Sequence, residues 1–156
     1  MKRHPDSPGV IAWPPLLYAG ALALGILLHL AVPARPFPPG PARWVAGGVL
    51  ALLSLGLALW GERTMHRAGT NVNPMQPTIR IVTGGPFRFS RNPLYLSLTG
   101  LYVAIALLAN LLWPLVLLVP LMIVVQQGLV KREERYLEAK FGEEYRAYRA
   151  RVRRWL

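Results

Sequence analysis

From Asn92 to Val130 the chain contains no charged residue, which limits the folds open to it. A single helix of that length would extend roughly 58 Å, about twice the ~30 Å hydrocarbon thickness of a bilayer. The stretch should therefore fold into a helical hairpin that turns near Asn110. Pro114 follows shortly, and proline suits the first turn of a new helix. We predict membrane spans at residues 93–109 and 112–130.

Two further apolar runs lie upstream, at residues 13–32 and 44–60, and a proline-rich loop separates them. The chain has 156 residues, is 53% hydrophobic and has a mean hydropathy of +0.33, which is typical of one domain embedded in a bilayer. The first run is long for the apolar part of a signal peptide, and the later spans favour its retention. We predict an all-α membrane protein with four transmembrane helices in a single domain, residues 1–156.

The basic residues are unevenly distributed between the two sides that alternating spans would give. One side would carry sixteen, in the N-terminal segment, the middle loop 61–92 and the tail 131–156, and the other only Arg35 and Arg43. This bias predicts a multi-pass protein of the inner or plasma membrane with both termini in the cytoplasm. The same placement argues that the net charge of +11 does not mark a nucleic-acid surface.

Cysteine is absent, so disulfides, thiolate chemistry and cysteine-ligated metals are excluded. The three histidines, His4, His29 and His66, stand at unrelated spacings, which argues against a metal site. No metal and no nucleic acid are therefore expected as partners.

The middle loop and the tail each have their own pattern. Residues 78–82 and 86–89 alternate apolar and polar side chains around Gly84 and Gly85, which suits either a small β-hairpin or an irregular loop on the membrane surface. In the tail, apolar residues recur every three or four positions and predict an amphipathic cytoplasmic helix, bent at Gly142. That stripe consists of Leu137, Phe141, Tyr145, Tyr148, Val152 and Trp155.

The stretch GGPFRFSRNPLY, residues 84–95, opens the third predicted span. Asn92 is a preferred N-cap residue and Pro93 a preferred first helical residue. Free backbone N–H groups at that helix end, together with Arg91, favour a bound anion. The alternative is that Asn92 and Pro93 only begin a helix while Arg91 meets lipid phosphate.

The ordered set of features resembles a known family. Gly-Pro-aromatic-Arg precedes Arg-Asn-Pro-x-Tyr, a helical hairpin follows, and then come Glu133 and Glu134, Leu137, Phe141-Gly142, Tyr145, Tyr148 and Val152. Over roughly residues 70–156 this resembles the isoprenylcysteine carboxyl methyltransferases and the related phospholipid N-methyltransferases, which are integral membrane enzymes. The carboxyl methyltransferases usually have histidine at the position of Asn92, and the asparagine found here is more similar to the phospholipid methyltransferases. The C-terminal spacing, in contrast, is closer to that of the carboxyl methyltransferases.

The resemblance implies S-adenosylmethionine bound at the cytoplasmic side, between the last two spans and the tail. It implies a lipophilic acceptor from the bilayer, an isoprenylcysteine-like carboxylate or a phospholipid amine. Catalytic roles would fall to Arg91, Asn92 and Glu134. Helical spacing leaves the alternative that Glu134 is part of an ordinary solvated charged face, paired with Lys131 or Arg135. Cofactor contacts would come from Gly85, Pro86, Arg91, Asn92, Pro93, Tyr95, Glu133, Glu134, Leu137, Tyr145 and Tyr148.

Methyl transfer from a sulfonium is an in-line displacement that needs orientation and exclusion of water but no metal or covalent intermediate. The lack of any cluster of cysteine, histidine or metal-binding residues is therefore compatible with methyl transfer. A small transporter usually needs an acidic residue within the membrane, and no predicted span contains one. A membrane reductase that uses a nicotinamide cofactor remains the alternative enzyme class.

Overall fold

Prolines set where the apolar helices begin. In the computed structural model, which describes residues 6–156, α1 (Pro14–Ala31) and α3 (Pro93–Leu108) start with proline in their first turn, and α2 (Ala42–Arg67) follows Pro41 directly. Proline at this position lacks only an N–H that would be unpaired anyway. The remaining helices are α4 (Leu112–Val125), the π-helical turn η2 (Gln126–Val130), α5 (Lys131–Phe141) and α6 (Glu143–Arg151).

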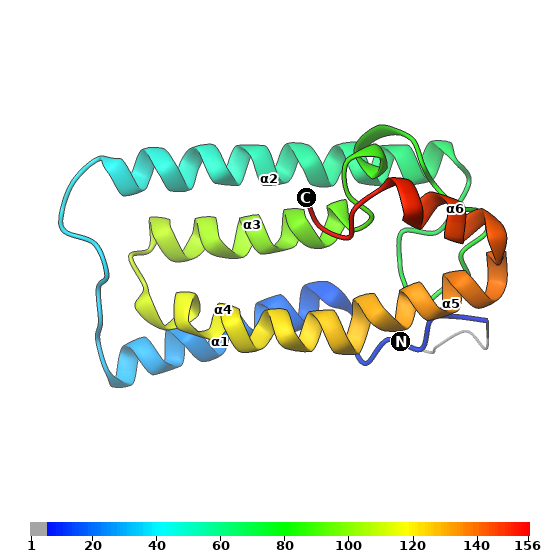
Figure 1. Cartoon of the computed structure of the whole chain (residues 1–156). Coiled ribbons are helices and arrows are strands. Elements are labelled where there is room, and N and C mark those ends of the chain that lie inside the picture. The colour runs from blue at the N-terminus through cyan, green and yellow to red at the C-terminus, as the bar shows by residue number, and fades with distance from the viewer. Residues whose placement is uncertain (1–5) are drawn as a thin grey trace.

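The regular secondary structure within residues 6–156 is all helical, and α1, α2, α3 and the run from α4 through α5 form one bundle (Figure 1). Three helices are long and apolar enough to cross a membrane: α1, α2 and the continuous helix Leu112–Phe141. Helix α3, with 16 residues, is shorter than these. Its length of about 24 Å, at 1.5 Å per residue, falls short of the ~30 Å hydrocarbon core.

The predicted hairpin is present between α3 and α4. Asn110 turns the chain with a φ of 54°, a left-handed conformation that asparagine tolerates better than most residues. Its side chain also links this turn to the loop between α1 and α2. Phe37 N donates to Asn110 Oδ1 at 3.1 Å, and Asn110 Nδ2 donates to Phe37 O at 3.0 Å.

The sequence pattern predicts a tail helix separate from the fourth apolar run, but in the structure the two are continuous. Helix α4 continues through η2 into α5 along one course (Figure 1). The break comes at Gly142, as predicted, where φ is 53° and α6 folds back toward α3. The second apolar helix also exceeds its predicted range of 44–60, because residues Glu62 to Arg67 stay helical beyond the apolar part.

The middle loop does not form a β-hairpin, since residues 6–156 contain no strand. Residues 85–88 instead form a short 3₁₀ helix, η1 (Gly85–Arg88). In a hairpin the backbone N–H groups of this loop would bond to a neighbouring strand, but here side chains accept hydrogen bonds from two of them. Thr70 Oγ1 accepts from Ile79 N at 3.0 Å, and Tyr136 Oη accepts from Thr78 N at 3.2 Å.

The core lies between α1, α3 and α4, where Tyr18, Tyr102 and Leu121 are buried. The outward faces of the helices keep large apolar side chains, such as Leu27, Leu52 and Val119, at 63%, 73% and 66% exposure. Contiguous apolar surface of this kind is costly in water but favourable in lipid. The middle loop, α6 and the segment from Asp6 to Trp13 all lie at the same end of the bundle (Figure 1).

Candidate functional site

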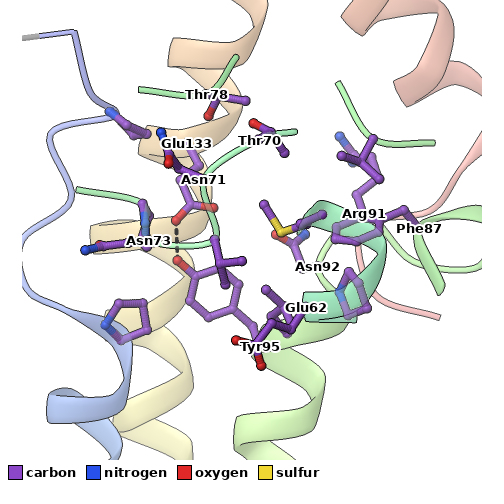
Figure 2. A pocket seen from close by; sticks show the side chains of 18 of the residues that line it. Glu62, Thr70, Asn71, Asn73, Thr78, Phe87, Arg91, Asn92, Tyr95 and Glu133 are labelled. Atoms are coloured by element: carbon purple, nitrogen blue, oxygen red, sulfur yellow. Dashed lines mark hydrogen bonds between the residues drawn. The ribbon is translucent and has the colours of Figure 1, made fainter. Parts of the chain in front are cut away.

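A cavity of about 530 Å³ lies at that end of the bundle, where α2 ends and α3 begins. Its walls come from the N-terminal segment, the end of α2, the loop of residues 70–82, the start of α3, and α5 with α6. Figure 2 shows Arg91 and Phe87 on one side, with Glu133, Asn71 and Asn73 on the other. The residues predicted to bind cofactor that line this cavity are Arg91, Asn92, Pro93, Tyr95, Glu133, Leu137, Tyr145 and Tyr148.

The start of α3 is held by hydrogen bonds to the C-terminal tail. Asn92 occupies the N-cap position, but its side chain makes no capping hydrogen bond to the helix. The amide Nδ2 donates instead to Arg154 O at 2.9 Å, and Ser90 Oγ accepts from Asn92 N at 3.1 Å. Asn92 and Pro93 therefore stand at the predicted N-cap and first helical positions, but the expected side-chain cap is wrong: the Asn92 side chain bonds to the tail and not to the helix.

Arg91 connects the cavity wall to α5, α6 and the C-terminal tail. Its Nη1 lies 3.0 Å from Glu134 Oε1 and donates to Tyr145 Oη at 3.2 Å. Its backbone N donates to Arg153 O at 2.9 Å. The Nε atom is buried and has no hydrogen-bond partner among the described residues. A buried unpaired donor on a cation is costly unless a ligand atom accepts from it.

Glu134 does not line this cavity. Its carboxylate bridges Arg91 and Arg154, and Arg154 Nε and Nη2 each donate to it at 2.8 Å. Helical spacing suggested Lys131 or Arg135 as its partners, but the folded-back tail brings Arg154 closer. On the opposite side Glu134 faces a second, more polar cavity, whose lining is completed by Gln127, Lys131, Arg135, Glu138, Arg149 and Arg154.

Glu133 points the other way from Glu134, into the main cavity. Tyr95 Oη donates a hydrogen bond to Glu133 Oε1, drawn as a dashed line in Figure 2. The neighbouring turn of α3 thereby fixes the orientation of the carboxylate. The cavity consequently presents a guanidinium and a carboxylate from different helices.

Two tyrosines of α6 complete an aromatic wall. Tyr145 and Tyr148 are 2% and 5% exposed, and their rings make an edge-on contact. Tyr148 Oη donates to Phe87 O at 2.8 Å, which ties α6 to η1. Burial raises the pKa of both phenols above the ordinary value, so both remain neutral near neutral pH.

Comparison with known proteins decides the family. Residues 42–144 match the sequence model of the phospholipid methyltransferases. The chain belongs to the phospholipid methyltransferase family. The match runs from α2 through α5, so two walls of the cavity, the segment before α1 and the tyrosines of α6, lie outside it.

One curated relative, an uncharacterized protein from Haemophilus influenzae, is 59% identical over 34 residues. Those residues make up 22% of this chain and 54% of the relative, so the chain spans about half the length of that protein. No solved structure matches the chain.

Two residues implied by the family resemblance, Gly85 and Pro86, lie behind the cavity wall. Gly85 has a φ of 56°, and a Cβ there would lie 2.5 Å from Thr64 Oγ1, so only glycine allows η1 to approach α2 this closely. Pro86 is fully buried. Both therefore shape the loop that carries Phe87 to the cavity.

Several of the residues that line the cavity were not identified from the sequence. Trp13, Pro14 and Pro15 come from the start of α1, and Glu62 and Met65 come from the end of α2. The loop of residues 70–82 contributes four uncharged polar residues labelled in Figure 2, Thr70, Asn71, Asn73 and Thr78, and also Arg80. The asparagine-rich sequence Thr70-Asn71-Val72-Asn73-Pro74 was the available signal, since such clusters favour turns with exposed polar groups. Among residues 6–156, no group of three acidic or histidine side chains could hold a metal ion.

Proposed function

We propose that the protein transfers a methyl group from S-adenosylmethionine to a lipophilic acceptor that enters from the bilayer. The observation that carries this proposal is that opposite charges line different sides of one cavity, the Arg91 guanidinium on one side and the Glu133 carboxylate on the other. The methionine part of the cofactor has a carboxylate and an ammonium group, which these two side chains would bind.

The size and lining of the cavity suit such a ligand. A volume of about 530 Å³ falls within the range of small-molecule sites. Tyr145, Tyr148 and Phe87 supply flat apolar surface for a purine ring, and Asn71 and Asn73 supply polar groups. Bound there, the cofactor would contribute a methyl group on a positively charged sulfur.

The protein's own residues would orient the reactants and exclude water, which is chiefly catalysis by proximity. The residues to which we assign catalytic roles are Arg91, Asn92 and Glu134, with Glu134 acting on Arg91 from behind the wall. A carboxylate acceptor needs no base, whereas an ammonium acceptor must first lose a proton. Glu133 and Glu62 are the carboxylates that line the cavity and could take it.

The acceptor we propose is an isoprenylcysteine-like carboxylate or a related lipid, with a phospholipid amine as the alternative that the family name favours. Apolar side chains of α2 and α3, namely Ala58, Leu94 and Leu98, line the part of the cavity that lies along the bundle. They would accommodate a hydrocarbon chain next to the polar ligand.

We further propose that α3 is a fourth span and that residues 1–156 act as one domain. Helix α3 lies beside α2 within the bundle (Figure 1), so it shares the environment of the longer helices despite its length. Both termini, the middle loop and α6 would then lie in the cytoplasm, on the side with sixteen basic residues.

The experiment is a transfer assay with the purified protein in lipid nanodiscs and S-adenosylmethionine labelled in its methyl group. A prenylated cysteine and phosphatidylethanolamine serve as separate acceptors. We expect label in the lipid fraction with one of them; a methyl ester releases it in base and an N-methyl group does not. Failure with both acceptors, together with thermal stabilisation by NADPH but not by S-adenosylhomocysteine, would favour the reductase instead.

A further inference from the structure

The C-terminal tail crosses the start of α3 immediately beside the cavity. After α6 ends at Arg151, residues 152–156 run back toward α2 and α3 (Figure 1). Backbone carbonyls of the tail accept three hydrogen bonds from the three residues just before α3. Arg91 N donates to Arg153 O at 2.9 Å, and Ser90 Oγ and Asn92 Nδ2 donate to Arg154 O at 3.2 and 2.9 Å.

The Arg154 side chain adds a connection of a different kind. Its Nε and Nη2 atoms contact the two oxygens of Glu134 at 2.8 Å each, the forked geometry that fixes a carboxylate in orientation as well as position. Arg91 approaches Oε1 of the same carboxylate at 3.0 Å. Glu134 therefore stands between a tail guanidinium and the guanidinium of the cavity wall.

Sharing one carboxylate between two guanidinium groups has an electrostatic consequence. A carboxylate paired with Arg91 alone would cancel most of its charge. Because Arg154 draws on the same carboxylate, the three groups keep a net charge of one positive unit. Of the three side chains, Arg91 lines the main cavity, whereas Glu134 and Arg154 do not. An anion in the cavity would thus meet a cation that is fixed in place and not neutralised.

We propose that Arg154 is a positioning residue that acts through Glu134 to hold Arg91 in its anion-binding orientation. This rests on the proposed function, because it takes the anion to be the carboxylate of the bound cofactor. The tail beyond the family match would then complete the site, although Arg154 does not line the main cavity. The residue would act on ligand affinity more than on the chemical step.

The test compares Arg154→Ala, Arg154→Lys and Arg151→Ala in nanodiscs. Arg151 is an exposed cation of α6 whose Nε bonds to Ala147 O, so its removal matches the charge change without touching the site. For Arg154→Ala we expect the Kd of S-adenosylhomocysteine and the cofactor KM to rise about tenfold, with kcat changed less than threefold. Arg154→Lys should recover part of that loss, since it restores the charge but not the fork, and Arg151→Ala should match wild type.

Amide hydrogen exchange supplies a readout that does not depend on the ligand. Arg154→Ala should speed exchange at the Arg91 amide, which donates to the tail, and Arg151→Ala should not. Unchanged affinity and unchanged exchange in Arg154→Ala would overturn the proposal, as would an equal loss in Arg151→Ala. If wild-type protein binds no S-adenosylhomocysteine, the proposed function fails, and the exchange result still decides whether Arg154 holds Arg91.

Discussion

Arg91 and Glu134 form an ion pair at 3.0 Å in which the two side chains are only 9% and 12% exposed. The pair joins the segment just before α3 to the first turn of α5, so it connects the two sequence motifs on either side of the helical hairpin. An ion pair this sheltered depends on both partners, because removing one leaves a charge that water solvates poorly.

Glu134→Gln should therefore lower both ligand affinity and stability. Glutamine keeps an acceptor oxygen but loses the charge that orders Arg91 and Arg154. We expect about a tenfold weaker affinity for S-adenosylhomocysteine and a loss of about 2 kcal/mol of unfolding free energy, the range of a hydrogen bond to a charged group. Isothermal calorimetry and thermal unfolding measure the two effects. Glu144→Gln, on the exposed face of α6, is the control, and a wild-type result for Glu134→Gln would remove Glu134 from the site.

Asn92 gives a second prediction, because its amide donates to Arg154 O and does not cap α3. Asn92→Ser is too short to reach the carbonyl, and Asn92→Asp would place a carboxylate beside it. We expect both variants to lose about 1 kcal/mol of stability and to bind ligand more weakly, with Asp the worse of the two. Melting temperatures and S-adenosylhomocysteine titrations on both variants check this. Full activity in Asn92→Asp would show that the tail contact has no functional role.

The proposed topology predicts opposite sides for the two loops that flank α2. Reporter fusions at Gly40 and Ala68 should report the periplasmic or external face and the cytoplasm, respectively, because alternating spans place Arg35 and Arg43 away from the other basic residues. Equal signals from the two fusions would rule out α2 as a crossing helix.

Gly25 offers a test of the packing between α1 and α4. A Cβ at Gly25 would lie 2.6 Å from Pro114 Cγ and 2.9 Å from its backbone N, and a proline ring cannot rotate away. Gly25→Ala should cost about 1–3 kcal/mol through overpacking, measured by thermal unfolding in detergent. Gly20→Ala, in the same helix with nothing within 4 Å, is the matched control and should stay at wild-type stability. Equal stability of the two variants would mean that α1 and α4 do not pack this closely.

The helical hairpin and its turn could be predicted because they follow from local chemistry. A charge-free stretch longer than a bilayer must reverse, and Asn110 and Gly142 suit left-handed turns. The family could be predicted for a similar reason, since its motifs are short and ordered along the chain. These signals depend on residues close together in sequence.

Contacts between distant segments could not be predicted in the same way. Sequence spacing offered Lys131 and Arg135 as possible partners of Glu134 on a solvated face, whereas its actual partners, Arg91 and Arg154, depend on the path of the tail. The side chain of Asn92 was expected to cap α3 because asparagine commonly does so, but the Arg154 carbonyl accepts from it. The segment before α1 has no periodicity, so nothing in it indicated that Trp13 lines the cavity.

Equilibrium binding of radiolabelled S-adenosylmethionine to the purified protein in nanodiscs tests the central claim most directly. We predict saturable binding at one site per chain that S-adenosylhomocysteine displaces and NADPH does not. Binding should be lost in Arg91→Ala and kept in Arg88→Ala, which removes an exposed cation of η1. Absence of saturable binding to the wild-type protein, displacement by NADPH, or wild-type affinity in Arg91→Ala would contradict the account.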